Sequence, residues 1–218
     1  MKSKHEIPGN KYKLITVPGG QLSPVYPNDV KPSNHQYLDG SLGGWNSTSN
    51  CENKYFNLYA SNRKEAGHEY GKKYAKEILE SLHRTHGVLD ESLKIVSHSM
   101  GGAYSKGFVE AIIEFAKAHP NLSNGLIISE FDFDPFQAGE LTAEPKVHTE
   151  QYTHKLAKNR GKWYNYFNPY VNIADERQGG LYKNNPDGDN NSYKESSTET
   201  SHAITTFVND ILKLEEGT

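Results

Sequence analysis

Short runs of apolar and β-branched residues alternate along the chain with longer segments of helical period. Runs of four to eight such residues, bounded by Gly, Pro, Asn or Asp, are typical of strands. They predict strands at residues 12–17, 55–60, 93–96, 126–131 and 147–154.

Three longer segments carry apolar side chains at spacings of three and four, the period of a helix with one buried face. They are residues 63–86, 100–119 and 201–214. Either Ser61 or Asn62 is a suitable N-cap for the first of these helices.

The alternation of strand and helix, with connections of this length, predicts the α/β class with a central, mostly parallel sheet flanked by helices on both faces. Two stretches rich in Gly, Ser, Asn or other polar residues, 21–53 and 179–200, are expected to be loops, and the aromatic run 163–173 is either an excursion or a further strand. A length of 218 residues, 34% of them hydrophobic, predicts one domain over residues 1–218.

Charge and targeting signals narrow the possible partners. The chain has 24 Lys and Arg against 27 Asp and Glu, and the basic residues are scattered, which argues against binding to nucleic acid. A single cysteine, Cys51, excludes an internal disulfide. The first residues lack the apolar core of a signal peptide, and no apolar run approaches the roughly 18 residues of a membrane span. We therefore expect a soluble chain without a transmembrane segment.

The sequence SHSMG, beginning at Ser97, separates a predicted strand from a predicted helix. A G-x-S-x-G nucleophile elbow belongs in this context, because its sharp turn needs small residues two before and two after the serine. Ser97 and Gly101 are those residues here, although the first is Ser rather than Gly. Ser99 is therefore the candidate nucleophile. The alternative is that Ser99 only caps the helix.

A serine nucleophile needs a base, usually histidine, to accept its proton. Among ten histidines, His202 is favoured because it begins the last predicted helix after a polar loop and can approach from the far end of the chain. The alternative is an exposed histidine at a helix start. His98 adjoins Ser99, but neighbouring side chains on a sharp turn diverge. His83 and His86 lie at the end of a predicted helix and are expected to be solvated, and His68 and His119 likewise lie on predicted helices.

The base in turn needs a carboxylate that holds its orientation and stabilises the imidazolium. Asp134, which closes a predicted strand before Pro135, is preferred. Asp175 and then Asp132 are the alternatives, and each can instead be a turn-forming aspartate.

An oxyanion hole needs two backbone N–H donors close to the reacting carbonyl. One is expected at Met100, at the start of the helix after the elbow, and the other near Gly20, in the Pro-Gly-Gly turn after the first strand. A simple turn at the end of the strand explains the two glycines of this Pro-Gly-Gly turn equally well.

Neither a metal nor a cofactor is expected. The stretch beginning at Asp187 imitates a calcium loop, but Ser192 replaces its glycine and Thr198 its bidentate Glu. His148 and His154 can face the same way along a strand, yet they lack a third zinc ligand.

The segment VSHSMGGAY, with a strand and Pro-Gly-Gly turn before it and a histidine-led helix after it, resembles the α/β-hydrolase superfamily, specifically its lipases. The segment IISEFDFDP is similar to the part of pancreatic-type lipases in which an Asp-Pro pair supplies the triad acid, here Asp134. Fungal-type (class 3) lipases carry the acid three residues after a Thr-His pair. Here Ala157 stands at that position after Thr153-His154, which is why Asp134 is preferred.

The whole chain is also similar to lipase-like toxin domains at the C-termini of Rhs-repeat polymorphic toxins of Bacteroidetes-type bacteria, through segments such as HTEQYTHK and GGWNSTSN. This resemblance implies an antibacterial effector that attacks membrane lipid, is delivered by a secretion machinery and is neutralised by an immunity protein.

These observations together predict a serine lipase or esterase that acts on (phospho)lipid or another carboxylic ester. Two alternatives use the same pattern. One is a catalytically inert binding module with a hydrolase fold, and the other is an acyltransferase or thioesterase. The sequence does not specify the acyl chain or the head group.

Overall fold

The computed structural model describes residues 12–17, 35–37, 60–154, 182–184, 191–197 and 204–215. Its strands are β1 (Tyr12–Val17), β2 (His35–Tyr37), β3 (Arg84–Thr85), β4 (Val88–Leu89), β5 (Ser92–His98), β6 (Ile128–Phe133), β7 (His148–His154) and β8 (Asn191–Ser197). Its helices are α1 (Ala60–Glu80), α2 (Gly101–Ala118), α3 (Pro120–Ser123) and α5 (Val208–Glu215), with short 3₁₀ turns η1 (Ala138–Glu140) and η4 (Ile204–Phe207).

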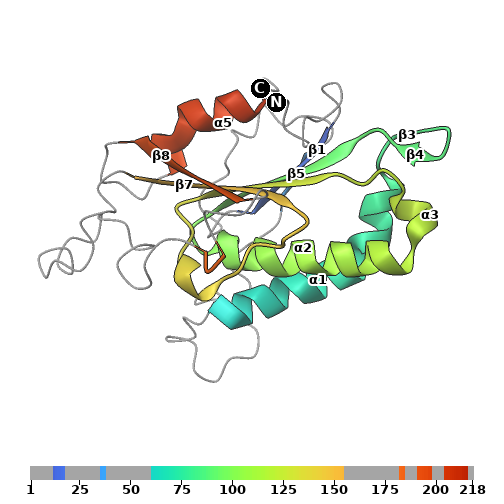
Figure 1. Cartoon of the computed structure of the whole chain (residues 1–218), viewed down its shortest axis with the longest axis horizontal. Helices are drawn as coiled ribbons and strands as arrows, with labels where there is room; N and C mark the ends of the chain where they lie inside the picture. Colours follow the sequence, from blue (N-terminus) through green and yellow to red (C-terminus); the bar gives the residue numbers. More distant parts are fainter. Residues whose placement is uncertain are drawn as a thin grey trace, which may run out of the picture.

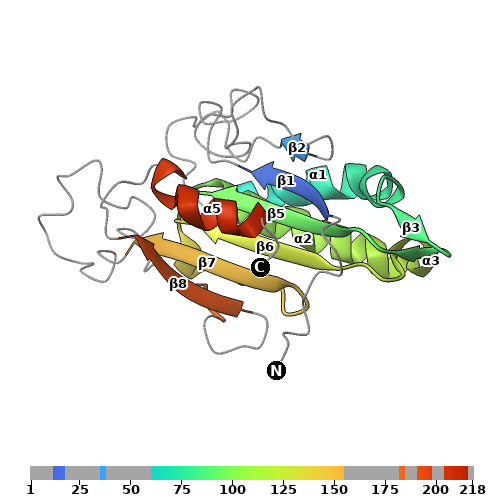
Figure 2. The same cartoon turned by 90° about the horizontal axis from the view of Figure 1, so that it is seen from above.

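Six of the described strands form one sheet in the order β2-β1-β5-β6-β7-β8, and every neighbouring pair is parallel (Figure 2). The chain first steps outward from β1 to β2 and then returns to the other side of β1 with β5. The direction of strand addition therefore reverses between β1 and β5. In open parallel sheets, ligands bind beyond the carboxyl ends of the strands at such a switch point.

Helices α1 and α2 cover one face of the sheet and α5 covers the other (Figure 1). The larger apolar core lies between the sheet and the α1–α2 pair, and a smaller one lies under α5. The α/β class with a parallel sheet covered on both faces is thus confirmed. Every residue of β5 and of β6 is buried, as expected for central parallel strands.

Glycines allow α1 and α2 to approach each other closely. A Cβ atom on Gly107 of α2 would lie 1.7 Å from the carbonyl oxygen of Lys64, and one on Gly67 of α1 would lie 1.9 Å from that of Tyr104. Each distance is far below van der Waals contact, so both positions exclude any side chain. The pair packs backbone against backbone, which fixes α2 firmly over the sheet.

The first helix ends earlier than predicted, at Glu80. The segment after α1, expected to stay helical to residue 86, instead forms the β3–β4 hairpin. His86 and Gly87 both have positive φ, 52° and 80°, which is what a tight two-residue hairpin turn requires. The strand predicted at 55–60 is wrong at its end, because Ala60 begins α1. The rest of that strand lies outside the described residues.

Two short strands lie inside segments expected to be loops: β2 within 21–53, and β8 within 179–200. The strand predicted at 126–131 is shifted by two residues to β6. The aromatic run 163–173 lies outside the described residues. Among the helices that the structure describes, none is long and apolar enough to cross a membrane.

Candidate active site

Ser99 occupies the turn between β5 and α2, at the carboxyl end of the central strand next to the switch point. Its φ of 56° is left-handed, a conformation uncommon for any residue with a side chain. Three backbone hydrogen bonds hold it there. The Ser99 N–H donates to the carbonyl of Phe133 (3.1 Å), and the Ser99 carbonyl accepts from the N–H groups of Gly102 (3.1 Å) and Phe136 (2.9 Å).

The chain passes closely around this turn. A Cβ atom on Gly102 would lie 2.7 Å from Cβ of Pro135, so the start of α2 fits against the β6–β7 connection only without a side chain. Ser97, on the other side of the turn, is buried and directs its hydroxyl to Asp132. Contacts with the neighbouring segment therefore require a residue without a side chain at Gly102, and Ser97 is held by a hydrogen bond to β6.

Asp134 is the second left-handed residue at this edge of the sheet. It follows β6 directly, has a φ of 46° and is fully buried. Its N–H donates to the carbonyl of Tyr152 in β7 (2.8 Å). His98 and Phe133 are register partners in β5 and β6, so Ser99 and Asp134 leave two neighbouring strand ends at the same level.

Strained backbone at two adjacent strand ends is informative, because such conformations persist where the surrounding structure enforces them and they cluster at functional sites. Both residues were singled out from the sequence as nucleophile and acid. The structure brings their backbones to neighbouring strand ends, with Ser99 next to the switch point. His202, Asp175 and Gly20 lie outside the described residues, so their places in this site stay predictions.

The structure describes the remaining candidates. Met100 is the N-cap of α2 and packs against Phe136. This position places its backbone at the positive end of the helix dipole, where a developing negative charge is stabilised. Asp132, the third-ranked acid, lies within β6 rather than at its end, and its carboxylate is engaged elsewhere.

Four of the other described histidines do not compete well for the role of base. His119 caps the far end of α2, about 27 Å along an 18-residue helix from the elbow. His68 bonds Glu114 on the surface between α1 and α2, and His83 bonds Asp90 near the β3–β4 hairpin. His98 is buried, and strand alternation places its side chain on the face opposite that of Ser97.

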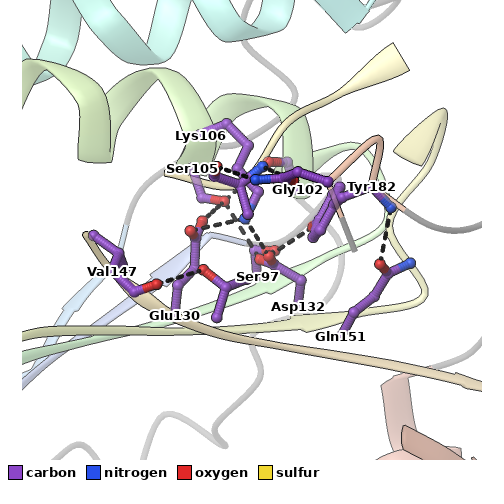
Figure 3. A network of polar contacts seen from close by, with 12 residues as sticks. Ser97, Gly102, Ser105, Lys106, Glu130, Asp132, Val147, Gln151 and Tyr182 are labelled. Atoms are coloured by element: carbon purple, nitrogen blue, oxygen red, sulfur yellow. Dashed lines mark hydrogen bonds and ion pairs between the residues drawn. The ribbon is translucent and has the colours of Figure 1, made fainter. Parts of the chain in front are cut away.

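A buried polar network lies beneath the elbow, between α2 and the sheet (Figure 3). The Lys106 ammonium donates to Glu130 Oε2 (2.8 Å) and to Asp132 Oδ2 (2.6 Å). Tyr182 donates its hydroxyl to the same Asp132 oxygen (2.6 Å), and Ser97 donates to the other.

Ser105 completes the network on the helix side. Its hydroxyl contacts Glu130 Oε1 (2.6 Å) and the carbonyl of Gly102 (2.9 Å). Every network side chain is at most 3% exposed. We refer to Ser97, Ser105, Lys106, Glu130, Asp132 and Tyr182 as the buried network.

Burial and mutual charge shift the pKa values in this network. Burial, together with the nearby Asp132 carboxylate, raises the pKa of Glu130 to about 7. Burial lowers the pKa of Lys106, but the carboxylates of Asp132 and Glu130 raise it more, so the net shift is upward and the ammonium stays charged. Burial, followed by the same two carboxylates, raises the pKa of Tyr182 well above its usual value, so the phenol stays protonated and donates.

Sequence reasoning missed the buried network, although one signal was present. Glu130 and Asp132 alternate with apolar residues in a strand that is otherwise suited to complete burial. Two carboxylates two positions apart share one face of a strand, and a buried pair requires a cation nearby. That reasoning could have led to a search for a buried lysine, which is Lys106.

No metal centre emerges from the described part of the chain: within it, no group of three or more His, Cys, Asp or Glu side chains is arranged to hold an ion. The calcium-like stretch that begins at Asp187 lies outside it up to residue 190, and its continuation from Asn191 to Ser197 is strand β8 rather than a loop. His148 bonds Glu150 (3.0 Å). Comparisons of the chain with protein-family models, with curated proteins and with solved structures find no match.

Proposed function

We propose that this chain is a serine hydrolase of carboxylic esters with Ser99 as its nucleophile. The observation that carries the proposal is the left-handed backbone of Ser99 in a strand-to-helix turn at the switch point of a parallel sheet. Helix capping alone does not account for it, since N-cap residues usually have extended backbone and Ser99 is instead left-handed. The finer assignment to the α/β-hydrolase fold and its lipases is part of this proposal.

Asp134 is proposed as the acid. Its left-handed backbone, burial and position at the end of the neighbouring strand support it over Asp132, which the buried network already engages. His202 is proposed as the base on sequence grounds. Asp175 stays the alternative acid.

The proposed reaction proceeds in two halves. His202 accepts the Ser99 proton as the serine oxygen attacks the ester carbonyl, and Asp134 holds the resulting imidazolium in orientation. The Met100 N–H at the start of α2, with a second donor near Gly20, stabilises the oxyanion. The leaving alcohol takes the proton from His202. Water then hydrolyses the acyl-enzyme through the same groups, which releases the acid and regenerates Ser99.

Membrane (phospho)lipid is the proposed substrate class, with the role of an antibacterial effector, its delivery by a secretion machinery and its neutralisation by an immunity protein. These follow from the resemblance to lipase-like toxin domains.

A fluorophosphonate probe tests the nucleophile directly, because it forms a covalent bond preferentially with activated serines. We expect the wild type to be labelled at Ser99 and Ser99→Ala to be unlabelled. Ser123→Ala, a serine substitution near the far end of α2, is the matched control and should label like the wild type. An unlabelled wild type would refute the proposal and favour an inert binding module.

Mass spectrometry of fatty acids released from mixed phospholipids then tests the substrate class. Release by the wild type and none by Ser99→Ala is expected. Labelling without release, but with transfer to an added alcohol or thiol, would point to an acyltransferase. Asp134→Asn and Asp175→Asn identify the acid, since the true acid should lower the rate by roughly 10³- to 10⁴-fold when neutralised. A loss below about tenfold in both would exclude both assignments.

A further inference from the structure

The hydrogen bond between Ser97 and Asp132 lies directly behind the two strained residues. Ser97 and Asp132 are register partners in β5 and β6, and each stands two positions before one of them, Ser99 or Asp134. The bond therefore joins the carboxyl ends of β5 and β6, which the proposed nucleophile and the proposed acid directly follow. Any change in the spacing of these strand ends changes the spacing of Ser99 and Asp134.

Lys106 connects the same point to the helix. It lies two turns into α2, and its ammonium reaches Asp132 and Glu130 on β6. Ser105 beside it contacts the carbonyl of Gly102 in the first turn of α2. The three elements that form the elbow, β5, α2 and β6, are thus joined by buried polar contacts as well as by packing (Figure 3).

Both oxygens of Asp132 are used in this arrangement. Oδ1 accepts from Ser97, and Oδ2 accepts from Lys106 and Tyr182. A carboxylate engaged on both sides has a fixed orientation, and its charge strengthens each bond. Asp132 is fully buried, so the buried network has no surface for a ligand and cannot be a second binding site.

The departure from the elbow motif now has a physical reason. Glycine is the usual residue two positions before the nucleophile because the turn is crowded. Serine is tolerated here, and its hydroxyl supplies a contact that glycine cannot make, the bond to Asp132.

We propose that Ser97, Asp132 and Lys106 are positioning residues that hold Ser99 and Asp134 in productive relation, a role that rests on the function proposed above. They touch neither substrate nor reacting atoms. Their effect is on geometry, and a misplacement of about 1 Å in a reactive group lowers rates by roughly 10²-fold. Their removal should therefore lower kcat and leave KM nearly unchanged.

The experiment compares the wild type, Ser97→Ala and Asp132→Asn in two assays, fluorophosphonate labelling rate and steady-state hydrolysis of a p-nitrophenyl ester. Ser97→Ala removes one hydroxyl without adding volume and is the variant most certain to fold. We expect its labelling rate and kcat to fall by about 10- to 100-fold with KM within threefold of wild type. Asp132→Asn should lower the labelling rate and kcat more than Ser97→Ala does.

Arg84→Met is the matched control. Arg84 donates to the carbonyls of Leu79 at the end of α1, of Leu82 just after it and of Leu122 in α3, so its loss removes several hydrogen bonds far from the elbow. Its Tm should fall while its labelling rate stays at the wild-type value, which separates lost stability from lost positioning.

The outcomes are distinguishable. If folded Ser97→Ala reacts within twofold of the wild type, the positioning role is overturned while the nucleophile assignment stands. If the wild type does not react with the probe, the proposed function fails, and the positioning role fails with it. If Asp132→Asn does not fold, Ser97→Ala alone decides.

Discussion

Glu130→Gln should reduce the loss of stability that the protein shows as the pH rises from about 4.5 to about 7. Burial and the Asp132 carboxylate raise the pKa of Glu130 from 4.5 in the unfolded chain to about 7 in the folded protein. Between these values the folded state keeps a proton that the unfolded state releases. Stability must therefore fall with rising pH across this window, because the folded state binds more protons.

The magnitude follows from the size of the shift. One pKa unit corresponds to about 1.4 kcal/mol, so a shift from 4.5 to about 7 corresponds to an upper value of about 3 kcal/mol in the free energy of unfolding. The groups that face Glu130 are Lys106 and Ser105 of α2 and Asp132 of its own strand. In the Gln variant, Lys106 still pairs with Asp132, so the buried charge is balanced at every pH in the window.

The assay is denaturant unfolding of wild type and Glu130→Gln at pH 5, 6, 7 and 8, with the difference in unfolding free energy plotted against pH. The difference should shift in favour of Glu130→Gln by about 2–3 kcal/mol between pH 5 and pH 8. Glu77→Gln, an exposed glutamate on α1, is the control and should give a flat difference. A flat curve for Glu130→Gln, or one of opposite sign, would refute the reasoning.

Two further predictions concern packing and buried charge. Gly107→Ala should lower the unfolding free energy by about 1–3 kcal/mol or more, because its Cβ would overlap the Lys64 carbonyl at 1.7 Å. The control is Lys117→Ala, an exposed position in the same helix, which should change the unfolding free energy by less than about 0.5 kcal/mol. Equal effects of the two substitutions in thermal melts would contradict this prediction. Arg63→Met should leave Tm unchanged or raise it. The Arg63 guanidinium is fully buried, and within the described residues it donates one side-chain hydrogen bond, to Gln137 (2.5 Å), while its Nε and Nη1 have no hydrogen-bond partner. A fall of more than about 3 kcal/mol in the unfolding free energy of Arg63→Met would show that the guanidinium stabilises the fold and would contradict this prediction.

Elements with a dense apolar period could be predicted from the sequence. The helix expected at 100–119 is α2, and the strand expected at 93–96 lies within β5. Failures occurred where tertiary contacts outweigh local pattern. β8 is the polar sequence NSYKESS, an edge strand with no apolar alternation, and only its pairing with β7 makes it a strand. The β3–β4 hairpin arises from a turn at His86-Gly87 within a helical pattern.

The strained turn at Ser99 could be predicted because its signal is local: five consecutive residues at a strand-to-helix boundary require a particular turn. Asp134 has a similar local signal in the proline that follows it. The buried network has none of this kind. Lys106 contacts Asp132 only because the phase of α2 and the register of β5 against β6 bring them together, and neither can be obtained from one segment alone.

A strained site needs contacts between segments, such as those of the buried network, because local turn geometry alone does not hold it. Left-handed backbone at Ser99 and Asp134 costs of order 1–3 kcal/mol at each residue, so both positions would relax unless their surroundings over-determine them. Backbone hydrogen bonds also hold each residue, Ser99 through Phe133 at the end of β6 and Asp134 through Tyr152 in β7. The Ser97–Asp132 contact, with Lys106 behind it, joins the two strand ends through side chains. If local turn geometry sufficed, Ser97→Ala would fold and react normally; if the spacing of Ser99 and Asp134 matters for the chemistry, it would fold and react slowly.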